Sequence, residues 1–207
     1  GCFDTTADDD SMHAQRRKAL RLVAQIPVIT AYFHRHRQSL PLIEPDYALG
    51  EAANFLYMLT GQKPEPETEG TMDMCYVLHA EHGMNASTFA ARVTIATLSD
   101  TYSAITSAIG TLKGPLHGGA NEGVIKMLLE IGSPENVDAY IEDALAQKKK
   151  IMGIGHRVYK VLDPRAPHLK KMAQQLCGKL GDPKWIQMSE RIADLMRQKK
   201  GLHANVD

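Results

Sequence analysis

The sequence has few cysteines, no long apolar run and no excess of charge of either sign. Its three cysteines, Cys2, Cys75 and Cys177, are too few and too scattered for a disulfide framework or a zinc knuckle. Free thiols of this kind fit a reducing compartment, and we expect the cytoplasm. Lys and Arg total 24, as do Asp and Glu, so the net charge favours neither nucleic acid nor an acidic membrane as a partner. No apolar segment approaches the roughly 18 residues of a membrane span.

The N-terminus lacks both an initiator methionine and a signal-peptide pattern, since it reads Gly1-Cys2-Phe3-Asp4. We therefore expect the chain to begin inside a longer protein. Its 207 residues suit one large domain or two small ones. An apolar content of 43% is ordinary for a globular protein and supplies a substantial core.

Helical patterns dominate the chain, and no convincing strand of more than a few residues is present. Pro27 should bend or split the first helix because proline lacks a backbone donor, and residues 63–67 are typical of a proline-rich loop. The fold class predicted is all-α. The predicted helices cover residues 13–38, 45–60, 72–78, 87–98, 101–112, 121–131, 133–150, 167–180 and 183–199.

Two neighbouring helices, 87–98 and 101–112, are rich in small residues and nearly uncharged. Alanine and serine at close spacing allow helices to approach each other closely. We expect both helices to be buried or to form a contact between subunits.

Three histidines stand beside glycines at breaks between helices, namely His82, His117 and His156. Loops on a rigid scaffold carry many catalytic groups, and histidine transfers protons readily near neutral pH. Any one of the three could instead cap a helix or satisfy a buried hydrogen bond. Together they favour an acid–base site, but they do not identify a reaction.

Other chemistry-bearing residues have plainer interpretations. His79 and His82 are spaced like a metal pair, but no further ligands complete a site, so we expect no metal. The glycines around residues 110–119 lack the Gly-Lys-Ser/Thr ending of a phosphate loop. Arg165 could clamp a dicarboxylate or simply lie on the surface. Residues 148–150, all lysines, could meet phosphates or stabilise a helix C-terminus.

Three motifs together resemble bacterial-type citrate synthase in residue identity, order and spacing. They are His79-Ala80-Glu81-His82 with Asn85-Ala86-Ser87-Thr88, the run from Gly114 to Glu122, and the run from Gly155 to Arg165. The resemblance extends over essentially the whole chain. It implies a large and a small helical domain with the active site in the cleft between them. Residues 1–118 would form part of the large domain and residues 119–207 most of the small domain, with truncation at both ends.

The activity that the resemblance implies is condensation of acetyl-CoA with oxaloacetate to citrate and CoA, the first step of the tricarboxylic acid cycle. The CoA thioester would be a substrate, and no cofactor would be bound permanently. Family members form dimers, and helices 87–98 and 101–112 resemble part of that interface. The 207-residue chain alone is expected to have little activity, because further substrate-binding arginines should lie beyond it.

The resemblance also implies separate roles for individual residues. His82 would bind an oxaloacetate carboxylate, as would Arg165. His117 would hydrogen-bond the thioester carbonyl during enolisation, while His156 would polarise and protonate the oxaloacetate ketone. Asp207 would remove the methyl proton.

Two segments support these assignments. The chain ends in Ala204-Asn205-Val206-Asp207, where the family has a Pro-Asn-Val-Asp-like sequence, so alanine replaces the usual proline. The loop expected to wrap the adenine side of CoA comprises Lys150, Ile151, Met152, Gly153 and Ile154.

Two other functions remain open. The same motifs occur in 2-methylcitrate synthase, which uses propionyl-CoA, and one methylene changes discrimination by only about 1–3 kcal/mol. A non-catalytic helical scaffold with structural histidines is the alternative from a different class.

Overall fold

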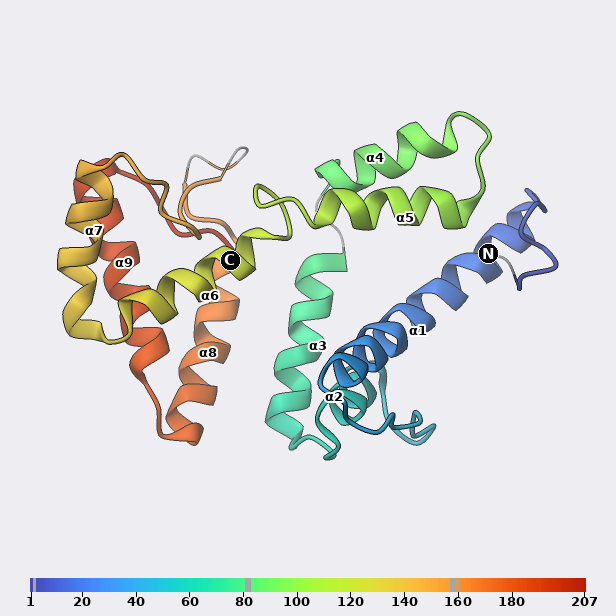
Figure 1. Cartoon of the computed structure of the whole chain (residues 1–207), viewed down its shortest axis with the longest axis horizontal. Coiled ribbons are helices and arrows are strands. Elements are labelled where there is room, and N and C mark those ends of the chain that lie inside the picture. Colours follow the sequence, from blue (N-terminus) through green and yellow to red (C-terminus); the bar gives the residue numbers. More distant parts are fainter. Residues whose placement is uncertain (2, 81–82, 157–158, 160) are drawn as a thin grey trace. The chain divides into compact units, whose positions relative to one another are not determined.

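A computed structural model describes residues 1, 3–80, 83–156, 159 and 161–207. The regular elements of these residues are helical, apart from one isolated β-bridge (Figure 1). None of the helices in the described part of the chain is long and apolar enough to cross a membrane. The elements are α1 Met12–Arg37, α2 Glu51–Thr60, α3 Pro66–Ala80, α4 Ala86–Ile95, α5 Thr101–Leu112, α6 Ala120–Ile131, η1 Pro134–Asn136, α7 Val137–Ala146, α8 Ala166–Leu180 and α9 Lys184–Lys200.

The all-α prediction is confirmed, and most helix ends follow local signals. Ser11 caps α1 by accepting a hydrogen bond from the amide of Ala14, and Asn85 caps α4 in the same way. Pro27 lies inside α1, which is one helix of 26 residues, so the helix is not split, and the bend expected there stays a prediction. The expectation of a loop over residues 63–67 was wrong at its end, because Pro66 begins α3, where the first turn of a helix needs no proline N–H.

The chain divides into two compact units, residues 1–110 and 111–207. The predicted boundary after residue 118 concerns the domains of the complete enzyme and stays a prediction. In the first unit α1 packs against α2, and α2 against α3. Its buried apolar side chains are mostly small: Ala14, Ala31, Ala52, Ala53, Met58 and Ala104.

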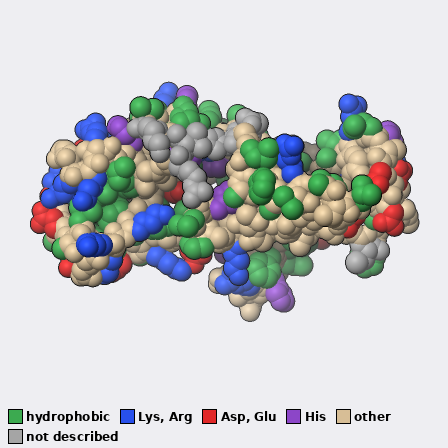
Figure 2. Space-filling view, turned by 90° about the horizontal axis from the view of Figure 1, so that it is seen from above, with side chains coloured by type: hydrophobic (Ala, Val, Ile, Leu, Met, Phe, Trp, Pro, Cys, Tyr) green, Lys and Arg blue, Asp and Glu red, His purple; other side chains and the backbone are tan. Residues whose placement is uncertain are grey.

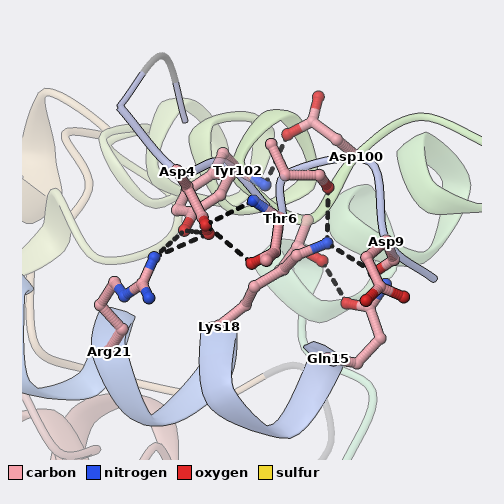
Figure 3. A network of polar contacts seen from close by, with 10 residues as sticks. Asp4, Thr6, Asp9, Gln15, Lys18, Arg21, Asp100 and Tyr102 are labelled. Atoms are coloured by element: carbon pink, nitrogen blue, oxygen red, sulfur yellow. Dashed lines mark hydrogen bonds and ion pairs between the residues drawn. The ribbon is translucent and has the colours of Figure 1, made fainter. Parts of the chain in front are cut away.

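Polar contacts attach residues 4–9 to α1 and α5 (Figure 3). Lys18 is 1% exposed, and its ammonium donates to the carbonyls of Ala7 and Asp9 at 2.5 and 2.9 Å. Asp4 lies 2.8 Å from the Arg21 guanidinium and accepts a hydrogen bond from the Tyr102 hydroxyl. These contacts lower the pKa of Asp4, with the Tyr102 hydrogen bond contributing most. Residues 4–9 are therefore held against α1 and α5 by the Asp4 carboxylate and by the Lys18 ammonium.

Helices α4 and α5 expose apolar side chains. The Ser87 hydroxyl of α4 donates to the Ala108 carbonyl of α5 at 3.0 Å, which is the close approach that small residues allow. Phe89, Val93 and Ile109 nevertheless remain half or more exposed, and Figure 2 shows hydrophobic side chains gathered on part of the surface. The expected burial of this pair is not achieved within the chain itself, and its role as a subunit contact stays a prediction.

The second unit has a larger core, made by α6, α7 and α9 with residues 151–154. Ion pairs and hydrogen bonds tie its helices together, since Arg191 of α9 pairs with Asp138 of α7 and Glu190 of α9 lies 2.9 Å from Lys170 of α8. The buried members of this core are Met127, Leu128, Ile131, Val137, Ile141, Ala144, Ile151, Met188, Ile192, Leu195 and Met196.

Candidate active site

His117 lies in a tight turn directly before α6. Its amide donates to the Gly114 carbonyl at 2.9 Å, and its carbonyl accepts from the Ala120 amide at 2.9 Å. The next two residues must be glycine. A Cβ on Gly118 would lie 2.5 Å from the Leu112 side chain, and a Cβ on Gly119 would lie 2.5 Å from the Lys113 carbonyl oxygen. The glycines thus fold the chain tightly enough to hold His117 at the start of the helix.

The loop after α7 crosses the N-terminal half of α6. Ile151 is 5% exposed and belongs to the core, whereas Met152 packs over Gly123, where a Cβ would lie 3.0 Å from its methyl group. Gly153 has φ +75°, and a Cβ there would lie 3.1 Å from Val124 and 3.8 Å from the carbonyl carbon of Asp207. Only glycine suits this crossing, which brings α6, the loop and residue 207 together.

The C-terminal residues pair with this loop in a short antiparallel arrangement. Gly155 donates to the His203 carbonyl at 2.7 Å, and Asn205 donates to the Gly153 carbonyl at 3.0 Å, on either side of the bridge between Ile154 and Ala204. The Asn205 side chain adds a bond to the Gly155 carbonyl at 3.0 Å. The pairing holds Asp207 next to the loop that leads into His156.

His156 has a defined hydrogen-bonding partner on one ring nitrogen. The amide of Tyr159 donates to its Nδ1 at 3.1 Å, and the two rings lie 4.7 Å apart between centroids. Because Nδ1 accepts this bond, the neutral imidazole carries its proton on Nε2. Nε2–H is therefore the donor group of the neutral ring.

Arg165 is held by a buried carboxylate two residues earlier in the sequence. Its Nε and Nη2 donate to the two oxygens of Asp163 at 3.0 and 2.8 Å, and its amide donates to the same carboxylate at 3.0 Å. Burial alone would raise the pKa of Asp163, but these bonds, with a smaller effect of His156, lower it. Asp163 raises the pKa of Arg165, and Tyr159 and Asp207 add to this effect. Arg165, His156 and Asp207 thus share one electrostatic environment.

A cavity of about 600 Å³ opens beside these segments within the second unit. Its walls come from α6, α8 and α9, the loop and the C-terminal residues, and they are mainly apolar. Met152, Gly153 and Ile154 line it, as do Asn205 and Asp207. This volume and this mainly apolar lining suit a small-molecule ligand.

The structure brings together some of the predicted residues. Asp207 lies against the loop at Gly153, and Lys150 is exposed at the start of that loop. His82 lies outside the described residues. In the described part of the chain, no group of three His, Cys, Asp or Glu side chains could hold a metal ion.

Sequence reasoning missed Asp163, Tyr159 and Asn205 as site residues. Asp163 could have been noticed, because an aspartate two residues before Arg165 is correctly spaced for an ion pair ahead of a helix. The contacts of Tyr159 with His156 and of Asn205 with Gly155 could not be predicted from a local sequence pattern.

Comparison with known proteins gives a consistent result over the whole chain. The family model described as citrate synthase, C-terminal domain, matches residues 1–207. Citrate synthase 2 of Bacillus subtilis is 53% identical over 207 residues, which is all of this chain and 56% of that protein. A 2-methylcitrate synthase of Mycobacterium tuberculosis is 44% identical over 97% of this chain and 51% of its own length.

A solved ternary complex of citrate synthase from Thermoplasma acidophilum with carboxymethyl coenzyme A and oxaloacetate has the same fold. It superposes with a TM-score of 0.88 at 34% identity, covering 94% of this chain and 52% of that one. The chain thus spans about half the length of the relatives it matches.

Proposed function

The chain belongs to the citrate synthase family, and on this premise we propose that the complete protein condenses acetyl-CoA with oxaloacetate to give citrate and CoA. The observation that carries the proposal is the pairing of residues 153–155 with residues 203–205. This pairing holds a carboxylate, Asp207, beside the loop that leads into a histidine, His156. The proposed base, Asp207, lines the mainly apolar cavity, and His156 is the proposed acid. The reaction would be the first step of the tricarboxylic acid cycle.

Asp207 is proposed as the base that removes a proton from the acetyl methyl group. A thioester methyl is a very weak acid, so a carboxylate needs help from a hydrogen bond to the developing enolate oxygen. His117 is proposed to supply that bond from its turn before α6. The rigid turn at Gly118 and Gly119 supports this role, because a preorganised donor need not move as charge develops.

His156 is proposed to polarise the ketone of oxaloacetate and to protonate the new alkoxide. The hydrogen bond from the Tyr159 amide to Nδ1 supports this assignment, since it leaves the proton on Nε2. His156 would pass its Nε2 proton to the alkoxide oxygen, and the proton that Asp207 removed from the methyl group would return to the ring through solvent, so that both groups are restored. His156 is one of the groups that lower the pKa of the buried Asp163 carboxylate, so the acid and the partner of Arg165 interact electrostatically.

Arg165 is proposed to bind a carboxylate of oxaloacetate. Asp163 occupies the Nε edge of the guanidinium, so a substrate carboxylate would meet the Nη1 side. With its plane fixed in this way, the arginine can orient the substrate for attack. His82 is proposed as a second carboxylate ligand on the family resemblance alone.

CoA is proposed to bind as a substrate, without any permanently bound cofactor. Met152, Gly153 and Ile154 line the cavity and suit its apolar parts, and the exposed Lys150 suits its phosphates. Ile151 would support the loop from beneath, because its side chain belongs to the core. The exposed apolar residues of α4 and α5 favour a homodimer through these helices, which sedimentation of the complete protein would measure. The scattered cysteines favour a cytoplasmic location.

The alternative substrate is propionyl-CoA. It is supported by the 44% identity to a 2-methylcitrate synthase, against 53% to a citrate synthase. The higher identity favours acetyl-CoA. The ratio of kcat/KM for the two thioesters on the complete protein decides between them, and a preference for propionyl-CoA would replace the proposal.

The proposal is tested by assaying the complete protein that contains this chain for CoA release from acetyl-CoA and oxaloacetate. We expect turnover, and we expect His156→Ala to lower kcat by about 10²–10⁴-fold, the usual contribution of a general acid. His168→Ala is the control, since His168 is exposed on α8. A complete, folded protein without turnover, or equal activity of both variants, would contradict the proposal.

A further inference from the structure

The Asn205 side chain bridges two segments of the candidate active site. Its Nδ2 donates to the Gly155 carbonyl at 3.0 Å, and its Oδ1 accepts from the Asp207 amide at 2.9 Å. Its own amide donates to the Gly153 carbonyl at 3.0 Å. One residue thus bonds to the backbone of the proposed base and to the backbone of the residue just before His156.

The chemistry of the bridge requires an amide side chain. An amide offers a donor and an acceptor at the same time, and both are used here on opposite sides. Aspartate would keep the acceptor for the Asp207 amide but would present oxygen to the Gly155 carbonyl oxygen. Alanine would remove both bonds. The Gly155 carbonyl is about 50 positions away in the sequence, so this bond joins parts of the chain that have no local connection.

We propose that Asn205 is a positioning residue that fixes Asp207 relative to the loop carrying His156. This inference rests on the proposed function, in which those two residues are the base and the acid. Asn205 does not need to touch the reacting atoms. It sets where the carboxylate stands, and a displacement of about 1 Å at a reacting group can lower a rate by about 100-fold.

The test compares Asn205→Ala and Asn205→Asp with the parent in the complete protein, using acetyl-CoA with a normal or a deuterated methyl group. Both variants should lower kcat by about 10–100-fold. They should change the KM for oxaloacetate by less than about threefold, because Arg165 and its partner Asp163 are untouched. The deuterium isotope effect on kcat should rise, since removal of the methyl proton becomes the slower step.

Asn54 supplies a matched control in the other unit. Its amide group also donates and accepts at once, bonding the carbonyl and the amide of Asp46 at 3.0 Å each. Asn54→Ala should lower the thermal stability while leaving kcat and the isotope effect as in the parent. This comparison separates a positioning role from a general loss of stability.

The outcomes distinguish the two proposals. A parent protein without turnover overturns the proposed function and the positioning role with it. An active parent whose Asn205 variants keep kcat within twofold, or lose kcat with an unchanged isotope effect, overturns the positioning role alone. If Asn205→Ala does not fold, the nearly isosteric Asn205→Asp decides the matter by the same criteria.

Discussion

Replacing Asp163 with asparagine tests how strongly the candidate site depends on its buried ion pair. The Asp163 carboxylate is 0% exposed and the Arg165 side chain 12% exposed. Asparagine keeps the size of the side chain and one acceptor oxygen, but it removes the charge. The variant therefore leaves a nearly buried guanidinium opposite a neutral amide.

The expected loss of folding stability follows from the number and type of bonds that Asp163 makes. Removing one partner of a buried ion pair usually costs about 3–5 kcal/mol, because the other charge stays buried without compensation. Asparagine can still accept from Arg165 through one oxygen, so we expect about 2–3 kcal/mol, from weakening of charge-assisted hydrogen bonds. At about 2–4 °C per kcal/mol for a chain of about 200 residues, the Tm should fall by about 4–12 °C.

The assay is thermal unfolding followed by circular dichroism, with Asp182→Asn as the matched control. Asp182-Pro183-Lys184 leads into α9, whose first residue is Lys184, whereas the similar run Asp163-Pro164-Arg165 ends directly before α8. Its ion pair is 3.5 Å long with side chains 49% and 42% exposed, and such pairs contribute about 0–1 kcal/mol. Asp182→Asn should therefore shift the Tm by less than about 4 °C.

The stability difference between the parent and Asp163→Asn should depend on pH. The bonds from Arg165 lower the folded-state pKa of Asp163 despite its burial. A carboxylate of this kind stabilises the fold fully above its unfolded pKa of about 3.9, and loses that effect as the pH falls through its lowered folded pKa. The difference should thus be constant from about pH 5 to 7 and shrink below about pH 4. Equal Tm shifts for Asp163→Asn and Asp182→Asn between about pH 5 and 7 would refute this reasoning.

Two further substitutions test the backbone conformation at Gly153 and the contact of Lys18 with the N-terminal segment. Gly153→Ala should destabilise the fold by about 1–2 kcal/mol, because φ is +75° and the new Cβ would lie 3.1 Å from Val124. The control Gly178→Ala, in α8 with open space around it, should stabilise the fold by about 0.4–1 kcal/mol. Denaturant midpoints that shift in the same direction for both variants would contradict this. Lys18→Met should cost about 1–3 kcal/mol, since two carbonyls lose their buried donor. The exposed Lys171→Met should change stability by less than about 0.5 kcal/mol in the same urea titration, and an equal effect of both lysine changes would count against the role of Lys18.

The prolines show where local reasoning about the fold reached its limit. A proline inside a helix removes one hydrogen bond, yet α1 continues through Pro27. The buried side chains of α1 lie toward its two ends, at Ala14, Lys18, Ala31 and Arg35, and helix propensity is only a weak prior when such tertiary contacts are available. Residues 63–67 were predicted to form a loop for the same local reason, but proline suits the first turn of α3.

The sequence by itself determined the helical class, most helix ends and the candidate histidines. These depend on signals within a few residues, such as the caps Ser11 and Asn85 and the periodic spacing of apolar positions. The motifs around His117 and His156 are equally local, so they could be read directly. The two glycines after His117 and the start of the next helix lie within the same few residues.

Only the tertiary structure decided how these local pieces act together. The bond from Asn205 to Gly155 joins residues 50 positions apart, and the crossing at Gly153 places α6 next to residue 207. The tautomer of His156 and the orientation of Arg165 likewise depend on which partners fold against them. Such contacts are set by the packing of the whole unit, because a hydrogen bond between distant segments forms only where the core brings their backbones together.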